Sequence, residues 1–173
     1  MKIIIIGLGL IGGSIAKALS SAQDYEIFAF DSDQQSIKNA LHNQSIQGSL
    51  NSLNDLESAE YSHSLVIIST PPSVTNDILK SLDFLFNSSV TITDTTSTKS
   101  SLNKTLQEFN FPKNFIFSHP VAGSHLSGEK NSVADLFNGK STILSYHDSV
   151  ASQHVDRVTN LWNALGSNIT VLD

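Results

Sequence analysis

The sequence predicts an α/β fold in which a mostly parallel sheet carries helices on both faces. Short β-branched runs alternate with segments of helical spacing along the whole chain, the pattern of a doubly wound sheet. Residues 3–6 and 65–68 are apolar at every position, which is typical of strands buried on both faces. The chain has 173 residues and no Pro/Gly-rich linker, so we expect residues 1–173 to form one domain.

Strands are expected where β-branched and aromatic residues cluster, because such side chains suit a pleated, buried surface. A short additional strand is expected near Ser49, within the polar stretch 44–64, which is otherwise interpreted as loop. The expected strands cover residues 2–6, 26–30, 65–69, 90–93, 115–118, 142–145 and 168–172.

Five helices are expected between these strands, each marked by apolar residues three or four positions apart. The third should begin at Pro71-Pro72, and Gly166 should cap the end of the fifth. A short helix is also expected at 133–137, followed by a turn at Asn138-Gly139. The apolar faces are Ile11, Ile15, Ala18 and Leu19; Ile37, Ala40 and Leu41; Val74, Ile78, Leu79 and Leu82; Leu102, Leu106 and Phe109; and Val155, Val158, Leu161, Trp162 and Leu165.

The composition excludes several classes of function. With 10 Lys and Arg against 16 Asp and Glu, the net charge of −6 argues against nucleic acid as a partner. The absence of cysteine excludes disulfide scaffolds, thiolate zinc sites and cysteine catalysis, and fits a cytoplasmic protein. The apolar run 3–13 is too short to cross a membrane. No histidine pattern indicates a metal site.

A glycine-rich motif follows the first expected strand and opens the first expected helix. In this G-x-G-x-x-G pattern the first glycine permits a tight turn, the second lets a pyrophosphate approach, and the third lets the helix pack on the strand. The helix N-terminus offers free amides to the phosphates. The predicted fold is therefore of the Rossmann type. The motif consists of Gly7, Leu8, Gly9, Leu10, Ile11 and Gly12.

An acidic residue, Asp31, ends the second expected strand, where it can accept hydrogen bonds from the adenine ribose. Its carboxylate would repel a 2′-phosphate, and residues 32–37 contain no Lys or Arg to bind one, so we expect NAD rather than NADP. In the alternative interpretation the glycines only shape a turn and Asp31 caps the next helix. Asp33 is interpreted as a solvated cap.

Thr70 and Pro71 follow the strand at 65–69, at a carboxyl end where open α/β sheets bind ligands. They are therefore expected to border the cofactor. A helix started by proline and capped by Thr70 is nearly as good an interpretation, and the two are compatible.

Two further polar loops follow strands and should face the same crevice. One contains Asp94, Ser97 and Lys99; the other begins at His119, after the strand at 115–118. A histidine beside a nicotinamide can hydrogen-bond an alcohol that loses hydride. Lys99 can be interpreted as a solvated loop lysine.

These motifs together resemble the nucleotide-binding half of the prephenate/arogenate dehydrogenase family. The resemblance rests on GLGLIGGS at 7–14, the acid at Asp31, D-x-x-S-x-K at 94–99 and His-Pro-x-Ala-Gly-Ser at 119–124. It implies NAD-dependent oxidative decarboxylation of prephenate to 4-hydroxyphenylpyruvate, in tyrosine biosynthesis. His119 then matches the catalytic histidine that assists loss of the hydroxyl proton, and Ser97 matches the serine that orients the hydroxyl and the histidine.

The sequence departs from the family in three respects. Family members bind the substrate carboxylates with arginines, but Arg157 is the only arginine here. The family's C-terminal helical domain, which forms the homodimer, is expected to be absent. Many relatives have an acidic residue at the position of His125. We interpret His125 as a surface residue.

Several alternatives therefore remain open. The substrate could be arogenate, or a different β-hydroxyacid or imine, although the pairing of Ser97 with His119 disfavours the latter. The chain could also be a non-catalytic NAD-binding module or half of a split enzyme.

Overall fold

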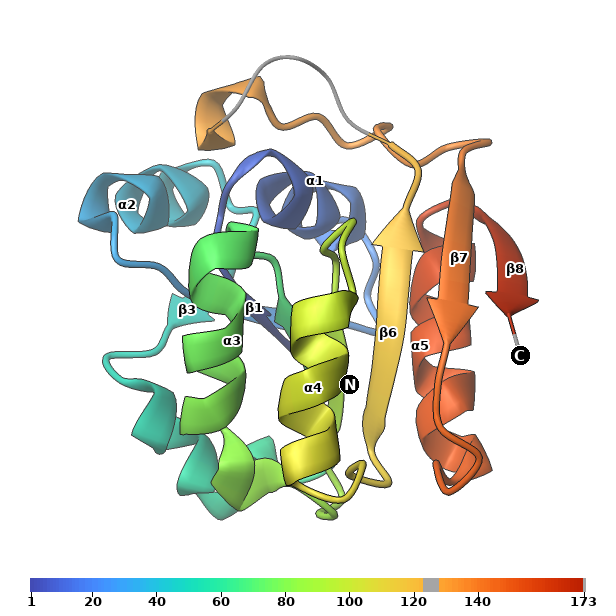
Figure 1. The fold of residues 1–173 in the computed structure, drawn as a ribbon. Helices are drawn as coiled ribbons and strands as arrows, with labels where there is room; N and C mark the ends of the chain where they lie inside the picture. Colours follow the sequence, from blue (N-terminus) through green and yellow to red (C-terminus); the bar gives the residue numbers. More distant parts are fainter. Residues whose placement is uncertain (123–127, 173) are drawn as a thin grey trace.

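A computed structural model describes residues 1–122 and 128–172 and shows one eight-stranded sheet with helices packed against it (Figure 1). The strand order is β3-β2-β1-β4-β5-β6-β7-β8. The strands are β1 (Lys2–Ile6), β2 (Glu26–Phe30), β3 (Gly48–Ser49), β4 (Leu65–Ile68), β5 (Thr91–Asp94), β6 (Phe115–Pro120), β7 (Ser141–Ser145) and β8 (Asn168–Leu172). The α-helices are α1 (Leu10–Leu19), α2 (Gln34–His42), α3 (Pro72–Ser81), α4 (Ser100–Glu108) and α5 (Ser152–Ala164). Short 3₁₀ helices are η1 (Leu53–Glu57), η2 (Ala59–Tyr61), η3 (Asp83–Leu85) and η4 (Glu129–Asn131).

The sheet is mostly parallel, as the sequence predicts. Strands β1 to β6 all run in one direction, while β7 pairs antiparallel to β6 and β8 runs parallel to β7. The expected short strand near Ser49 is β3, which pairs with β2 at the far edge. The carboxyl ends of β1, β2, β4, β5 and β6 therefore meet at one edge of the sheet, which is where ligands bind in this fold.

Both faces of the sheet are buried at β1, which explains the unbroken apolar run of this strand. Ile3 and Ile5 belong to a core with α1, α2 and α5, whereas Ile4 and Ile6 belong to a core with α3 and α4. In Figure 1, α3 and α4 stand before the sheet and α5 behind it. Since successive strand residues point to opposite faces, each apolar residue of β1 is used by one of the two cores.

The segment expected to be a short helix at 133–137 forms turns instead, so that prediction was wrong. The helical spacing would put Val133 and Phe137 on one face, but Val133 is 46% exposed and Phe137 is fully buried. Phe137 packs edge-to-face on Trp162 of α5, and the amide of Val133 donates to Ser14 Oγ of α1 at 3.0 Å. These contacts with α5 and α1 hold the segment in turns.

Glycines mark the end of α5 and the turn after residue 138, as the sequence predicts. Gly166 has φ +76° directly after the C-cap of α5, the left-handed position where glycine ends a helix. The expected Asn138-Gly139 turn is present, with Gly139 at φ +68°. Strand β6 extends two residues beyond the expected 118, so that His119 lies within the strand.

Candidate active site

The glycine motif forms a tight connection between β1 and α1. Gly7 has φ +97°, and a Cβ there would lie 2.6 Å from the carbonyl oxygen of Ser69. A Cβ on Gly12 would lie 2.0 Å from the carbonyl oxygen of Gly7, so only glycine lets the helix pack this closely. By contrast, a Cβ on Gly9 would meet none of the described residues within 4 Å, which leaves space over the backbone at that position.

The start of α1 lies beside this open space. Gly9 is the N-cap residue of α1 and supplies no side-chain hydrogen bond to its first turn. Gly9, Leu10 and Ile11 all line a cavity of about 430 Å³. Unpaired amides at a helix N-terminus attract anions, so the site offers a place for phosphate groups.

Leu8 and Gly12 contribute to the packing of the loop instead of lining the cavity. Leu8 is 1% exposed and belongs to the core that includes Ile15. Gly12 is buried in α1. Neither lines the cavity at the start of α1, so of the six motif residues these two act through the shape of the loop.

Asp31 is tied to the glycine loop. Its Oδ2 accepts a hydrogen bond from the amide of Leu8 at 2.6 Å, and its Oδ1 accepts from the amide of Asp33 at 2.8 Å. Asp31 also lines a second cavity of about 460 Å³ with Gly7, Gly9 and Thr70. Asp33, and not Asp31, caps α2 by accepting from Gln35, which contradicts the alternative assignment of the cap to Asp31.

Thr70 and Pro71 lie between the two cavities and line both. Helix α3 starts at Pro72, with Pro71 as its N-cap and no side-chain cap. The expected Thr70 cap is therefore absent. Instead, Thr70 Oγ1 lies 3.0 Å from Thr75 Oγ1, an arrangement that fixes the turn between β4 and α3.

Ser97 and His119 come together in the first cavity, as the position of their loops predicts. Ser97 is exposed in the loop after β5, and His119 is half-buried near the end of β6. The same cavity contains Gly9, Thr70 and Pro71. It therefore joins the helix N-terminus, which suits phosphates, to a hydroxyl and an imidazole.

Lys99 is not a solvated loop lysine, and that interpretation of the sequence was wrong. Its Nζ lies 2.6 Å from Asp94 Oδ2 and donates to the carbonyl oxygen of Ser118 at 2.7 Å. The Asp94 side chain is 0% exposed and the Lys99 side chain 26%. Burial lowers the pKa of the Lys99 ammonium, and the adjoining Asp94 carboxylate acts in the opposite direction. The ion pair therefore lies within the protein, next to the strand that carries His119.

Arg157 lies away from this cavity. Its Nη1 donates to the carbonyl oxygen of Ser89 at 2.7 Å and to Thr91 Oγ1 at 3.1 Å, at the amino end of β5. His119 lies at the opposite edge of the sheet, near the carboxyl end of β6. Arg157 therefore has a structural role, and the first cavity contains no arginine among the residues that line it.

The remaining expectations from the sequence concern His125, metal sites and membrane helices. His125 lies outside the described residues. Among the residues that the structure describes, no group of three or more His, Cys, Asp or Glu side chains could hold a metal ion. Within 1–122 and 128–172, no helix has the length and apolar character needed to cross a membrane.

Comparison with known proteins agrees with the motifs. The family model described as "Prephenate dehydrogenase, nucleotide-binding domain" matches residues 15–171. A prephenate dehydrogenase of Lactococcus lactis is 35% identical over 148 residues, which are 83% of this chain and 40% of that protein. A cyclohexadienyl dehydrogenase of Zymomonas mobilis is 29% identical over 172 residues, covering 98% of this chain and 57% of the relative. The chain thus spans about half the length of these curated relatives.

Solved structures show the same fold. Prephenate dehydrogenase of Aquifex aeolicus, in complex with hydroxyphenyl propionate and NAD⁺, superposes with a TM-score of 0.87 at 27% identity. The match covers 100% of this chain and 60% of that one. A Synechocystis arogenate dehydrogenase has a TM-score of 0.86 at 23% identity, with coverage of 99% and 59%. Since the family model matches nearly the whole chain, this protein belongs to the prephenate dehydrogenase family, in the part that forms the nucleotide-binding domain.

Proposed function

We propose that residues 1–173 are the nucleotide-binding domain of an NAD-dependent prephenate dehydrogenase. The reaction is the oxidative decarboxylation of prephenate to 4-hydroxyphenylpyruvate, a step of tyrosine biosynthesis. The observation that carries this proposal is one cavity that joins the N-terminus of α1 to Ser97 and His119. A relative of the same fold, from Aquifex aeolicus, is described with NAD⁺ and hydroxyphenyl propionate bound.

The residues at the sheet edge fit NAD. The open space over Gly9 admits a pyrophosphate, and the first turn of α1 offers its amides. Asp31 accepts hydrogen bonds from Leu8 and Asp33, and each carboxylate oxygen retains lone pairs for a ribose hydroxyl. NAD, when bound, supplies the acceptor for the hydride.

His119 is proposed as the general base. Hydride leaves the ring carbon that bears the hydroxyl, while the His119 imidazole takes the hydroxyl proton. Loss of carbon dioxide then leaves an aromatic ring: the electrons of the broken C–C bond enter the ring, and the ring oxygen takes back a proton from the His119 imidazolium to become the phenol. Ser97 is proposed to orient the hydroxyl toward His119, since both side chains line one cavity.

The substrate and the assembly also belong to the proposal. Prephenate carries two carboxylates, and Arg157 lies at the far edge of the sheet. We infer that the cations which bind these carboxylates come from outside residues 1–173, and that homodimer formation also depends on such a region. Arogenate undergoes the same ring chemistry and is the second candidate substrate, because a Synechocystis arogenate dehydrogenase shares the fold.

The test has two steps. The chain is titrated calorimetrically with NAD and with NADP, and we expect NAD to bind more tightly. Formation of NADH is then followed with prephenate and with arogenate in a protein that joins residues 1–173 to the region inferred to bind the substrate carboxylates, as wild type and as His119→Asn. We expect His119→Asn to lower kcat by roughly 10²–10⁴-fold, the usual effect of removing a general base. NAD binding without turnover of either substrate would instead support a binding module or one half of a split enzyme.

A further inference from the structure

We propose that Lys99 and Asp94 form a positioning unit that fixes the place of His119 and the tautomer of its ring. The proposal rests on the role given to His119 above. It concerns two residues that touch neither cavity in which the cofactor and substrate are placed. They act through the strand that carries His119.

Lys99 joins the loop after β5 to strand β6. Lys99 follows Ser97 in the loop after β5, and its Nζ donates to the carbonyl oxygen of Ser118, directly before His119. The same ammonium lies 2.6 Å from Asp94 Oδ2. A single side chain therefore connects the loop of Ser97 to the strand of His119.

Asp94 in turn orders the loop of Ser97. Its Oδ2 accepts from the amide of Thr96 at 3.0 Å and from the hydroxyl of Thr96, in addition to Lys99. The carboxylate is fully buried, and buried charges are retained only where partners compensate them. Lys99 and the Thr96 donors supply that compensation.

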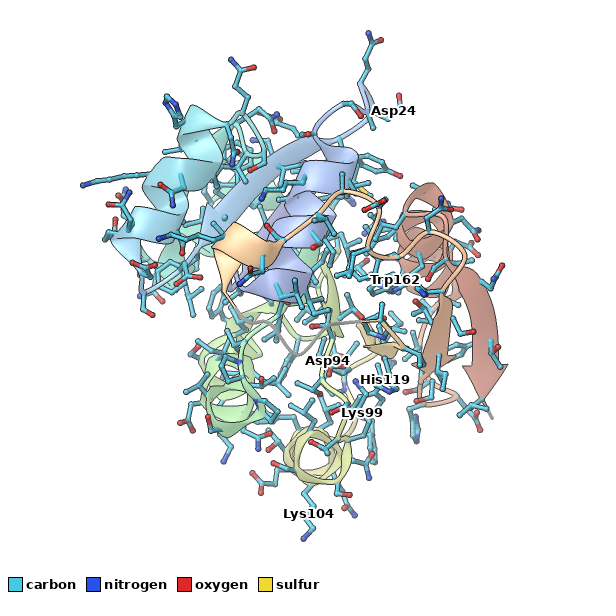
Figure 2. The ribbon with its side chains drawn as sticks, turned by 90° about the horizontal axis from the view of Figure 1, so that it is seen from above. Asp24, Asp94, Lys99, Lys104, His119 and Trp162 are labelled. Carbon is cyan, nitrogen blue, oxygen red and sulfur yellow. The ribbon has the colours of Figure 1, made fainter. Side chains whose placement is uncertain are left out.

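Ser118 is held from the opposite face as well. Its Oγ lies 2.7 Å from Thr93 Oγ1 and accepts from Trp162 Nε1 at 3.0 Å. With Lys99 on its carbonyl oxygen, the residue before His119 is fixed on both faces of the sheet. Figure 2 shows Asp94, Lys99 and His119 close together, with Trp162 on the other side of β6. An imidazole on such a support has little freedom to move, which favours catalysis by orientation.

Among the described residues, the His119 ring and the Asp94 carboxylate each have a buried atom without a hydrogen-bond partner. These atoms are His119 Nδ1 and Asp94 Oδ1. Strands β5 and β6 are paired with Asp94 opposite Phe117, and Phe117 and His119 point to the same face because they are two positions apart. An unpaired acceptor and an unpaired possible donor therefore lie on the same face of the sheet, two residues apart in register and without a hydrogen bond between them. A carboxylate acceptor at Nδ1–H leaves Nε2 free to take the hydroxyl proton.

The test uses the full chain labelled with ¹⁵N-histidine, in which the His119 ring signals are assigned with His119→Gln. Lys99→Met removes the ammonium, and Lys104→Met is the matched control, since Lys104 of α4 points into solvent (Figure 2). We expect Lys99→Met to change the tautomer ratio of the His119 ring and to lower kcat about 10²-fold, the scale of a small misplacement of a catalytic group. The Kd for NAD should stay unchanged, and Lys104→Met should match the wild type throughout.

A second variant distinguishes loss of positioning from loss of folding. Asp94→Asn combined with Lys99→Met leaves no unpaired charge inside the protein, and it should change the His119 ring spectrum in the same way. Wild-type ring spectra in both the Lys99→Met chain and the double variant would overturn the proposal. If the protein that includes the carboxylate-binding region binds NAD but turns over neither prephenate nor arogenate, the proposed function fails, whereas the ring spectra still decide the positioning role.

Discussion

The Asp31 carboxylate accepts a hydrogen bond from the amide of Leu8, with 2.6 Å between Oδ2 and the nitrogen. The acid at the end of β2 therefore holds the glycine loop at the end of β1, in addition to lining the second cavity. The glycine motif and Asp31 are therefore parts of one structure. A substitution of Asp31 should change the loop and the ribose contacts together.

We expect Asp31→Ala to weaken NAD binding roughly 10- to 100-fold, since hydrogen bonds to charged groups contribute about 1.5–3 kcal/mol. Preference for NAD over NADP should also fall, because the charge that repels a 2′-phosphate is gone. Calorimetric titration with both cofactors measures the two effects. The control is Asp33→Ala, which removes the cap of α2. It should lower the free energy of unfolding and leave the preference for NAD intact.

Alanine substitutions of Gly9 and Gly12 should have different effects, one on NAD binding and the other on stability. The Cβ of Gly9→Ala meets no atom of residues 1–122 or 128–172 within 4 Å, so the thermal midpoint should not change. The Kd for NAD should rise at least about tenfold if a pyrophosphate lies against Gly9. Gly12→Ala places its Cβ 2.0 Å from the carbonyl oxygen of Gly7. It should lower the free energy of unfolding toward the upper end of roughly 1–3 kcal/mol. Equal Kd values for wild type and Gly9→Ala would contradict the assigned phosphate position.

Much of this fold could be predicted from local sequence. Strands β1 and β4 contain uninterrupted apolar runs, so their positions follow from burial on both faces. The shared cavity of Ser97 and His119 also follows, because the carboxyl ends of parallel strands meet at one edge. The family was identified from the same motifs, and the family model confirms it.

The contacts of Lys99 could not be predicted, because they depend on the register between strands. Lys99 reaches the carbonyl oxygen of Ser118, nineteen residues away, only because β5 and β6 pair with Asp94 opposite Phe117. Local spacing contains no signal for that register. The turns at 133–137 were missed for a related reason: Phe137 is buried against Trp162, a distant residue, and this contact overrides the helical spacing.

Arg157 should matter for stability and not for the substrate. It donates to the carbonyl oxygen of Ser89 and to Thr91 Oγ1, and losing it leaves these acceptors without their charged donor. We expect Arg157→Gln to lower the free energy of unfolding by about 1–3 kcal/mol in urea titrations. The Kd for NAD should be unchanged. A large rise in the KM for prephenate with unchanged stability would show instead that Arg157 binds a substrate carboxylate.

The buried His154 should make stability depend on pH near neutrality. His154 is 3% exposed, with Nδ1 2.7 Å from Thr91 Oγ1. Burial first, and the Arg157 guanidinium second, lower the pKa of its imidazole from the ordinary value of 6.5. The unfolded chain therefore binds this proton more readily than the folded chain. The contribution to stability is complete above about pH 6.5 and is lost as the pH falls from there toward the folded-state pKa.

Urea titrations of the wild type from about pH 7.5 to about pH 5.5 should accordingly show a falling free energy of unfolding, in a range where carboxylates stay mostly ionised. His154→Gln is the informative variant, because glutamine has no proton to gain and can still hydrogen-bond the hydroxyl of Thr91. Its stability should fall less over the same range, even if it is lower at pH 7.5. Parallel pH profiles for the two chains would mean that another group, and not His154, causes the loss.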